Sequence, residues 1–413
     1  MKEWLVSSSG VDALDAEIIG VLGDVLDKGS RPGTWEAAVD AGLTGLAAPH
    51  DLGGEGLGFA GIEVMLRELG RRGHDLPVWE TLGCGLATLV RSADAQLRDT
   101  MVPQIVTGDL QIAPALAELG GVPSAPSTSL DGDRVSGMKL RVPVLAGRTL
   151  LMVSAAATDG ARAVLVDPEG PGVQRIDDVG SSDRPLATYR FTDAPAVAIL
   201  EPGSGDMLRQ HALAGQLAWA AGLLAGALEL TSEYIGTREQ FGRRLAEFQA
   251  VAQQIADVYI DARAVSLIAS EVARRIDAGD PLEDDLAIGS SIVCERGPRA
   301  VQTCHHLHGG TGVDITYPLH QYFSRLVDVT RLVGGRARAL AASPAIEGPG
   351  KGAELSASQR DFRDEVRGYF SGLVTREDRI ELLTDRHGPA YHRSIKQMGS
   401  DKMMGVGWPT EYG

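Results

Sequence analysis

The stretch TREQFGRRLAEFQAVAQQIAD, residues 237–257, decides the fold because it joins two long helical patterns. Before it, residues 211–238 read HALAGQLAWAAGLLAGALELTSEYIGTR, and after it, residues 248–279 read FQAVAQQIADVYIDARAVSLIASEVARRIDAG. Both are mostly apolar along one stripe, which is typical of helices in a bundle. Between them, Arg238 offers a fixed fork of donors suited to a pyrophosphate, and Phe241 offers an aromatic face.

A second segment, HLHGGTGVDITYPLHQYFSRLVD at residues 306–328, follows a third helical pattern, LEDDLAIGSSIVCERGPRAVQTCHHLHGG. Its glycines at 309, 310 and 312 let the backbone approach a ligand closely. If either segment stood alone, a helix with its terminal turn would explain it about as well as a ligand site would. Taken together, they are the most specific candidate for a ligand site in the chain.

Working outward from these segments, the chain reads as helices, a sheet and helices again. Residues 1–108 carry the helical patterns VDALDAEIIGVLGDVLDKG, TWEAAVDAGL and AGIEVMLRELGRRG. Residues 109–203 carry short β-branched runs between Gly, Asp and Pro turns, which predict a small antiparallel sheet or barrel. Residues 204–342 predict a C-terminal helical bundle. The expected fold class is α+β, mostly α.

The remaining residues predict a linker and a new domain. Residues 343–357 are rich in Gly, Pro and Ser, a composition typical of linkers. Residues 358–413 begin a fresh domain, whose amphipathic helix SQRDFRDEVRGYFSGL places Phe362 and Phe370 on one side. Because 413 residues exceed one compact core, two to four structural units are expected.

Bulk composition narrows the function classes. A net charge of -16 argues against a duplex nucleic-acid binder, which needs a basic face. We expect no apolar run long enough to cross a bilayer, and therefore no membrane span. The three cysteines are odd in number and widely spaced, which disfavours a disulfide framework. The N-terminus carries acids where a signal peptide carries its apolar core, so the expected location is cytoplasmic.

Several local motifs are better explained as ordinary structural features than as functional sites. CHHLHGG, Cys304 to Gly310, suggests a metal ligand pair, but no second Cys or His cluster lies at zinc spacing, so an ordinary helix end is favoured and no metal site is expected. GGEGLG, Gly53 to Gly58, follows no convincing strand and is better explained as a turn before a helix than as a dinucleotide loop. Trp219 is expected in the core.

The quoted segments resemble the C-terminal domain of the acyl-CoA dehydrogenase family: TREQFG, then FQAVAQQIAD, then LHGGTGVDITYPL about sixty residues on. PHDLGGEGLG and LRELGR near the N-terminus fit the same family, so the likeness covers residues 1 to about 342. The resemblance implies an N-terminal helical domain, a central β domain and a four-helix bundle. It also implies an oligomer, expected here to be a homo-oligomer, in which each FAD spans two subunits.

The resemblance assigns cofactor contacts residue by residue. The flavin ring lies in one subunit, while the neighbouring subunit holds the adenosine pyrophosphate. The loop from His306 to Gly310 matches the family's QxxGG segment, with His in place of the usual Gln; an imidazole can still donate a hydrogen bond. The expected FAD contacts are Arg238, Phe241, Phe248, Gln249, His306, Gly309 and Gly310.

The family's catalytic base is not matched. The family reaction removes an α-proton from an acyl-CoA with a glutamate while the β-hydride passes to flavin N5. The usual base position falls on Gly334 in LVGGRARAL, and Gly cannot accept a proton. In some relatives the base lies at the start of the first bundle helix, near His211 to Leu213 here, with no acid closer than Asp206. A histidine base at 211 would be unusual, so no catalytic residue is expected in residues 1–342.

The flavin cradle departs from the family as well. The stretches ALAELGGVPSAP and KLRVPVL stand where the family has a Thr-Glu-Pro turn and a Trp-Ile-Thr strand. Arg141 and Pro143 therefore replace the Trp and Thr that line the ring, and proline has neither a donor nor a hydroxyl. Arg336 replaces the Thr after the catalytic Glu-Gly. The sequence thus predicts that the retained half of the FAD site serves a partner.

The last residues suggest where that partner comes from. GVGWPTEYG, Gly405 to Gly413, repeats the Gly, Pro and Gly spacing of Gly45, Pro49 and Gly53, 360 residues earlier. Residues 358–413 resemble the family's N-terminal domain again, which predicts a tandem copy continuing in a longer protein. Fused pairs of this kind resemble enzymes of actinobacterial steroid side-chain degradation. The acyl-CoA substrate is then expected in the partner copy.

Three functions remain open from the sequence. The first is a catalytically degenerate half of an acyl-CoA dehydrogenase, with an electron-transfer flavoprotein as its possible electron acceptor. The second is a structural half that binds no FAD. The third is an oxygen-using acyl-CoA oxidase or flavin monooxygenase on the same fold. FAD occupancy after replacement of Arg238 separates the first two, and the electron acceptor separates the third.

Overall fold

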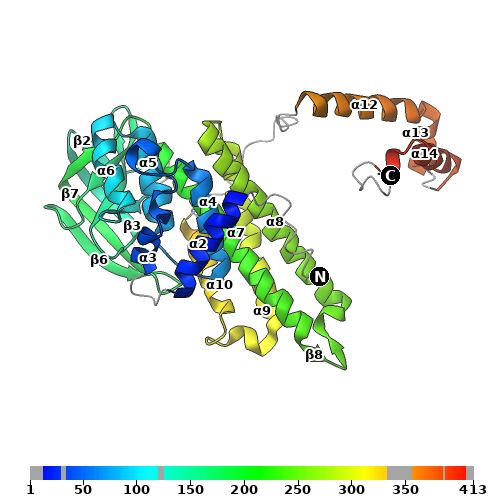
Figure 1. Ribbon diagram of the computed structural model, residues 1–413, viewed down its shortest axis with the longest axis horizontal. Helices are drawn as coiled ribbons and strands as arrows, with labels where there is room; N and C mark the ends of the chain where they lie inside the picture. Colours follow the sequence, from blue (N-terminus) through cyan, green and yellow to red (C-terminus); the bar gives the residue numbers. More distant parts are fainter. Residues whose placement is uncertain (1–12, 29–33, 120–124, 333–355, 385–386, 406–413) are drawn as a thin grey trace. The chain divides into compact units, whose positions relative to one another are not determined.

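The computed structural model describes residues 13–28, 34–119, 125–332, 356–384 and 387–405 (Figure 1). The chain divides into two compact units, unit 1 at Met1–Pro344 and unit 2 at Ala345–Gly413. Gly334, Arg336 and most of the predicted linker lie outside the described residues.

Unit 1 begins with helices on the segments whose apolar spacing predicts them. In α4, Ile62, Met65 and Leu69 form one buried face, and the helix begins at Gly58, the last residue of GGEGLG. The elements are α2 (Ala13–Lys28), α3 (Thr34–Asp40), η1 (Leu43–Gly45), η2 (His50–Leu52), α4 (Gly58–Arg72), the π-helix η3 (Val78–Leu86), α5 (Ala87–Ser92) and α6 (Ala95–Val106).

The middle of unit 1 is a β-barrel, as the alternating runs predict. Its strands are β1 (Gln111–Ala115), β2 (Ser129–Asp131), β3 (Arg134–Pro143), β4 (Thr149–Ala157), β5 (Gly160–Val166), β6 (Val173–Val179) and β7 (Pro185–Ile199). A ring closes through the pairings β4–β5, β5–β7, β7–β3, β3–β2 and β2–β4. Val135, Val153 and Phe191 pack in its interior.

The sheet is not purely antiparallel, which is a departure from the sequence prediction. β1 pairs with β4 in parallel, and β2 joins β4 in parallel through a single residue pair. A parallel pair requires a crossover connection, and here the β2–β3 hairpin supplies the connection between β1 and β4. β6 adds to the outside of the ring by pairing with β7 alone among the described strands.

Four helices form the bundle of unit 1. They are α7 (Ser204–Thr237), α8 (Gln249–Ala278), α9 (Glu283–His308) and α10 (Leu319–Leu332). The short hairpin β8 (Glu239–Gln240) and β9 (Arg243–Arg244), followed by η4 (Leu245–Glu247), connects α7 to α8. The turn η5 (Gly309–Val313) follows α9. Figure 1 shows α7 running beside α4, α8 and α9.

The sequence expectation about apolar runs is wrong for α7. Among the described residues, this helix alone is long and apolar enough to cross a membrane, with a mean hydropathy of 1.4 over its best window. However, 78% of that window is buried inside unit 1. The apolar composition is therefore that of a helix packed on all sides, which is the position it has in the bundle.

Glycines bring α4 and α7 into close contact. A β-carbon added at Gly222 of α7 would lie 2.0 Å from the carbonyl oxygen of Arg67, and one at Gly226 would lie 2.2 Å from that of Arg71. On α4, a β-carbon at Gly70 would lie 2.6 Å from the carbonyl oxygen of Trp219. The helices therefore pack backbone against backbone, a distance that only glycine permits.

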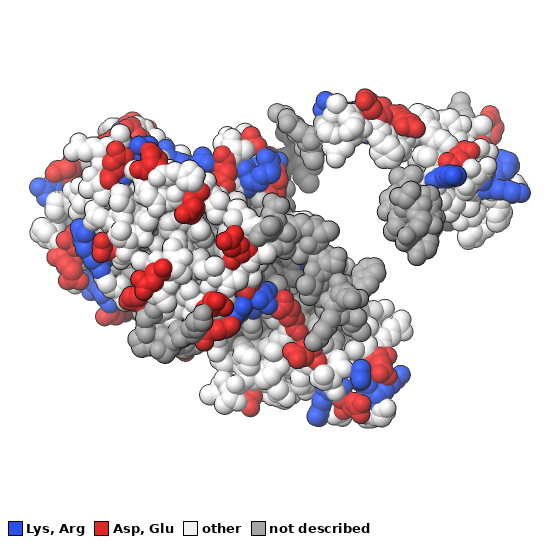
Figure 2. Space-filling model, in the orientation of Figure 1, with Lys and Arg blue, Asp and Glu red and all other residues white. Residues whose placement is uncertain are grey.

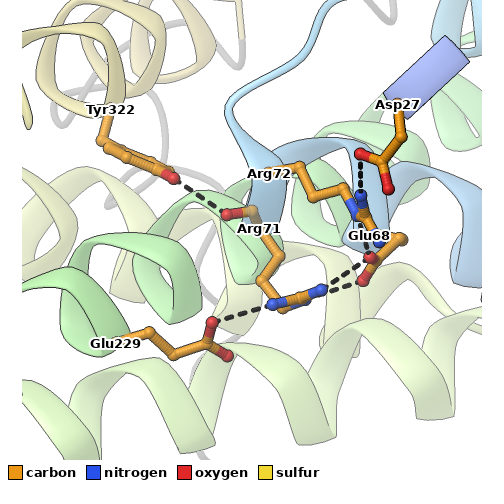
Figure 3. Close-up of polar contacts among 6 residues, drawn as sticks. All are labelled: Asp27, Glu68, Arg71, Arg72, Glu229 and Tyr322. Atoms are coloured by element: carbon orange, nitrogen blue, oxygen red, sulfur yellow. Dashed lines mark hydrogen bonds and ion pairs between the residues drawn. The ribbon is translucent and has the colours of Figure 1, made fainter. Parts of the chain in front are cut away.

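A polar network at the end of α4 fastens the N-terminal helices to the bundle (Figure 3). Glu68, which is buried, accepts hydrogen bonds from Arg71 and Arg72 at 2.7 Å. Arg71 also donates to Glu229 of α7 at 2.8 Å, and its carbonyl oxygen accepts from the Tyr322 hydroxyl of α10 at 2.9 Å. Arg72 reaches an aspartate of α2. The network thus links four helices.

Unit 2 consists of short helices with little interior among its described residues. They are α12 (Ala357–Leu373), α13 (Arg376–Thr384), α14 (Pro389–Ser400) and η6 (Met403–Gly405). α12 begins with a capping box, in which the hydroxyl of Ser356 and the side chain of Gln359 satisfy each other's backbone N–H. No described residue of α12 is buried, and Phe362 and Phe370 are half-exposed.

Candidate functional site

The first part of the candidate site is the turn that follows α7. The backbone N–H of Arg238 donates to the carbonyl oxygen of Tyr234 at 2.8 Å, which ends the helix, and Leu245 donates to the carbonyl oxygen of Arg238 at 2.9 Å, which closes the hairpin. Arg238 is exposed at this end of the bundle. Figure 2 shows cationic and anionic side chains side by side around the hairpin, rather than a uniformly basic patch.

Phe241 is the most unusual residue of this turn. It is 93% exposed and adopts φ 54°, a left-handed conformation that bulky residues rarely occupy. Its ring meets that of Phe248 edge-on with centroids 6.4 Å apart, and the guanidinium of Arg243 lies 4.0 Å from the centre of the Phe248 ring. An exposed aromatic ring held in a strained turn fits a surface that receives a ligand or partner.

The second part is the end of α9. The rings of Tyr234 and His308 stack with centroids 4.4 Å apart, and the Tyr234 hydroxyl donates to the carbonyl oxygen of His308 at 3.3 Å. This contact joins the ends of α7 and α9. Burial lowers the pKa of His308, so this ring is neutral at pH 7. Gly309 follows at φ 57° and ends the helix.

The predicted FAD contacts therefore lie at one end of the bundle. Apart from the half-buried Phe248, all of them are exposed: Arg238, Phe241, Gln249, His306, Gly309 and Gly310. This set fits an adenosine diphosphate, because a guanidinium and an amide can donate to phosphate oxygens. The fit extends to the backbone, since a β-carbon on Gly310 would meet nothing within 4 Å.

The residues expected beside a flavin ring lie on or near strand β3 of the sheet, away from the exposed end of the bundle (Figure 1). Arg141 is exposed and adopts φ 54° at an irregularity in the pairing of β3 with β7, and Pro143 ends the strand. Glu118, within the stretch ALAELGGVPSAP, forms a buried pair with Lys139 at 2.6 Å. The loop 120–124 lies outside the described residues.

The Glu118–Lys139 pair anchors the chain leaving β1 to β3. Burial alone would raise the pKa of Glu118, but hydrogen bonds from Lys139, Thr128 and Ser127 outweigh it and hold the pKa at about 2. Burial lowers the pKa of Lys139 to about 8, against the effect of its partner. Both groups are charged at pH 7, so the pair is a structural clamp within the sheet.

Neither alternative base position near the start of α7 presents an acid. Ala212 is buried, and its carbonyl oxygen accepts a hydrogen bond from the Trp79 indole at 2.9 Å. His211 is buried between Phe59 and Thr88, with Nδ1 2.9 Å from the Thr88 hydroxyl. Burial, with the nearby charge of Arg91, lowers the pKa of His211 to about 3.

Sequence reasoning missed the ion pair between Glu80, which is fully buried, and Arg184, whose side chain is 12% exposed. Glu80 lies on the π-helix η3 and pairs with Arg184, which precedes β7, while Trp219 of α7 lies beside the guanidinium. The signal available in the sequence was a single acid within the apolar run VWETLGCGL. A lone acid in such a run needs a partner, but nothing local indicates that the partner is 104 residues away.

Comparison with known proteins gives the class that this fold defines. Residues 11–109 match the N-terminal domain of acyl-CoA dehydrogenases, and residues 210–339 match their C-terminal domain. The chain belongs to the acyl-CoA dehydrogenase family, and FAD is the cofactor of that family. The predicted fold class and cofactor are thereby confirmed.

Two curated relatives come from Mycobacterium tuberculosis. Acyl-CoA dehydrogenase FadE28 is 40% identical over 308 residues, which cover 73% of this chain and 88% of FadE28. Acyl-CoA dehydrogenase FadE34 is 27% identical over 376 residues, which cover 90% of this chain but 48% of FadE34. Because unit 1 ends at Pro344, a match over 90% of the chain continues into unit 2.

Two solved structures share the fold closely. A variant of the steroid acyl-CoA dehydrogenase Tcur3481-Tcur3483 is 31% identical with a TM-score of 0.75, covering 80% of this chain and 96% of that chain. The ChsE4-ChsE5 complex from Mycobacterium tuberculosis is 28% identical with a TM-score of 0.73, covering 82% of this chain and 96% of that chain.

Proposed function

We propose that this chain is the catalytically degenerate half of an FAD-dependent acyl-CoA dehydrogenase, which desaturates an acyl-CoA thioester between its α and β carbons. Residues 1–342 hold the adenosine pyrophosphate of an FAD whose flavin ring lies in a partner copy. The observation that carries the proposal is the exposed set of donors and aromatic rings around Arg238 and Phe241. The buried Ala212 and the strained Arg141 stand where the family's base and ring wall would be.

FAD would be held through side chains at the bundle end. Arg238 and Gln249 would donate to the phosphates, Phe241 would cover an apolar face of the nucleotide, and Gly309 and Gly310 would let the backbone approach. When bound, FAD supplies the hydride acceptor, and this chain holds the nucleotide end of it. The base that removes the α-proton belongs to the partner copy, because neither Gly334 nor Ala212 carries an acid.

The partner copy begins, on this proposal, at residue 358 of the same polypeptide. Two structural features support a repeat at a shift of 360 residues. α3 ends at Asp40 and α14 ends at Ser400. A three-residue 3-10 helix then follows each of them, at Leu43–Gly45 and at Met403–Gly405.

The turn between helix and 3-10 helix repeats as well. Gly42 has φ 75° and Lys402 has φ 60°, so both lie in the left-handed region. The N–H of Gly42 donates to Val39 at 2.9 Å, and the N–H of Lys402 donates to Gly399 at 3.2 Å. A lysine in that conformation is rare, and its agreement with Gly42 supports a second copy of the N-terminal fold.

The relatives support proposals for the partner copy, the substrate and the assembly of this protein. FadE34 is the longer protein, and its match continues into unit 2, as a fused pair predicts. The ChsE4-ChsE5 complex supports pairing between unlike copies, and the Tcur3481-Tcur3483 enzyme supports a steroid-derived acyl-CoA as substrate. We place the assembly in the cytoplasm as an oligomer, with an electron-transfer flavoprotein as the electron acceptor.

The test is FAD retention in the assembled protein. The full chain is produced together with a complete acyl-CoA dehydrogenase copy, and FAD is released and counted per assembly. Replacing Arg238 with Ala removes a charged hydrogen bond to phosphate, which contributes about 1.5–3 kcal/mol, so FAD affinity should fall roughly 10- to 100-fold. Arg296→Ala, an exposed arginine on the same bundle paired with Asp261 at 3.0 Å, is the matched control and should retain FAD.

Two results would contradict the proposal. Unchanged FAD occupancy in the Arg238→Ala assembly would favour a purely structural half. Stoichiometric flavin on the purified chain alone, together with oxidation of an acyl-CoA, would mean that this chain has a complete active site.

A further inference from the structure

The two parts of the proposed FAD site lie on different helices, and a cluster of three rings fixes their separation. Arg238 follows the end of α7, whereas residues 306–310 form the end of α9 and the start of the turn η5. Donors that are held in place before binding lower the entropic cost of binding a diphosphate that spans them. The residues that set this separation therefore contribute to FAD affinity through the groups they hold.

His308, the last residue of α9, is the centre of the cluster and is buried. Its Nδ1 lies 2.8 Å from the carbonyl oxygen of Cys304, and because a carbonyl oxygen can only accept, Nδ1 carries the proton. In the neutral ring Nε2 is then an acceptor, and the Tyr317 hydroxyl donates to it at 3.1 Å. Each ring nitrogen has one partner, so the ring cannot turn without losing both hydrogen bonds.

Tyr234 connects this histidine to the helix that carries Arg238. Its ring stacks on the ring of His308 with centroids 4.4 Å apart and 24° between the planes, and its hydroxyl donates to the carbonyl oxygen of His308 at 3.3 Å. The carbonyl oxygen of Tyr234 accepts the N–H of Arg238 at 2.8 Å. The side chain of Tyr234 therefore holds the end of α9, while its backbone holds Arg238.

The loop of residues 309–317 leaves α9 at His308 and returns to the same ring through the Tyr317 hydroxyl. On the way, the carbonyl oxygen of Gly312 accepts Nδ1–H of His305 at 2.7 Å. A β-carbon on Gly312 would lie 2.7 Å from the carbonyl oxygen of His305, so the loop lies directly against the helix. His320 of α10 donates to the carbonyl oxygen of Tyr317 at 2.7 Å and holds the far end.

We infer that Tyr234, His308 and Tyr317 are positioning residues for FAD, which hold Arg238 and the glycines at 309 and 310 at the separation that the diphosphate requires. The inference rests on the proposed function, because it concerns the same FAD site. Both tyrosines act through a single hydroxyl, and their rings fill the space on either side of the histidine. Removing one hydroxyl should therefore shift the donors relative to each other while the bundle stays folded.

The cluster also links FAD affinity to pH. Protonation of His308 places a proton on Nε2, which can then no longer accept from Tyr317. Burial lowers the pKa of His308 from its ordinary value of 6.5, so the contribution of the neutral ring is fully present above pH 6.5 and is lost as the pH falls through the folded pKa. The titratable groups that face the cluster are Glu233 and Tyr234 from α7, Cys304 and His305 from α9, Tyr317 from the loop and His320 from α10.

The experiment measures the dissociation constant of FAD for the full chain assembled with a complete acyl-CoA dehydrogenase copy. Tyr234→Phe and Tyr317→Phe each remove one hydroxyl and keep the ring, so each should weaken FAD binding roughly 3- to 10-fold. Tyr322→Phe is the matched control, because its hydroxyl also donates to a backbone carbonyl, that of Arg71 at 2.9 Å, but holds no part of the loop. It should bind FAD as the wild type does.

A double-mutant cycle separates positioning from general destabilisation. If the Tyr234 hydroxyl acts through the placement of Arg238, it has nothing to place once Arg238 is replaced by Ala. Tyr234→Phe combined with Arg238→Ala should then bind FAD as weakly as Arg238→Ala alone, whereas two independent losses would add. Titration with acid gives a second measurement: FAD affinity of the wild type should fall at mildly acidic pH, and the fall should be smaller in Tyr317→Phe.

Three outcomes overturn the inference. The first is FAD binding by Tyr234→Phe and Tyr317→Phe that is as tight as that of Tyr322→Phe. The second is full additivity of Tyr234→Phe with Arg238→Ala. The third is an acid-induced fall of equal size in the wild type and Tyr317→Phe. If Arg238→Ala lowers FAD affinity while the tyrosine variants do not, the inference alone fails, and if Arg238→Ala has no effect, the proposed function fails.

Discussion

Replacing Gly222 with Ala tests the close backbone contact between α4 and α7. By helix propensity alone, Gly→Ala inside a helix should stabilise the protein by about 1 kcal/mol. The structure predicts the opposite sign. The new β-carbon would lie 2.0 Å from the carbonyl oxygen of Arg67 and 2.9 Å from the backbone nitrogen of Arg71, and a backbone atom cannot rotate away as a side chain can.

The magnitude follows from overpacking. Separating two helices enough to admit a methyl group typically costs about 1–3 kcal/mol, and the contact here is at the tight end of what a core must accommodate. The upper part of that range, about 2–3 kcal/mol, therefore applies, and subtracting the propensity gain of about 1 kcal/mol leaves an expected net destabilisation of about 1–2 kcal/mol. Urea denaturation, followed by the fluorescence of the buried Trp79 and Trp219, measures this difference.

A matched control lies on the same helix. A β-carbon at Gly236 would meet nothing within 4 Å, so Gly236→Ala should be neutral or stabilising by up to about 1 kcal/mol. If Gly222→Ala stabilised the chain as much as Gly236→Ala, the close approach of α4 and α7 would be refuted.

Two further predictions concern a buried histidine and the repeated turn. Because the folded pKa of His211 is about 3 and its unfolded value is about 6.5, the unfolded chain binds more protons between these values. The stability contributed by the neutral His211 should therefore be fully present above pH 6.5 and should be lost as the pH drops toward 3, with a slope of up to about 1.4 kcal/mol per pH unit. The variant His211→Gln should remove this slope, which urea midpoints measured across pH will show. An unchanged slope in the variant would assign the acid sensitivity to another group. In the repeated turn, Gly42→Ala should destabilise unit 1 and Lys402→Gly should stabilise unit 2, each by about 1 kcal/mol, because only the left-handed strain changes. Hydrogen exchange of the amides in α3 and α14 reads the two changes separately, and a Lys402→Gly variant with faster exchange in α14 would argue against the left-handed turn.

The elements of the fold that the sequence predicts are those set by local spacing. The apolar stripe of α4 and the long periods of α7 and α8 indicate helices because neighbours three and four residues apart share a face. The turn at Arg238 could be found because it interrupts two such periods with residues suited to a phosphate. The family resemblance then brought the turn together with His306, and the contact between Tyr234 and His308 joins those two helix ends.

The features that the sequence did not predict depend on contacts between distant segments. The parallel pairing of β1 with β4 follows from how the barrel closes, and the strand pattern of either segment is the same for both directions. The pairing of Glu80 with Arg184 joins η3 to the sheet across 104 residues. Exposure followed the sequence where a residue lay within a long apolar run: Trp219 was expected in the core and is 4% exposed.

The helix α7 has a buried middle, at Trp219, and ends at the exposed Arg238. Trp219 lies in the middle of α7 and Arg238 at its end, so the helix separates them by about 28 Å at 1.5 Å per residue. A rigid helix of this length lets the middle be filled with side chains while the end keeps its shape, because the α4 contact holds the middle and the Tyr234–His308 contact holds the end. Changes in the middle of α7 therefore need not disturb the surface at its end that serves a partner. On this argument, substitution of Trp219 should leave FAD retention unchanged in the assembled protein.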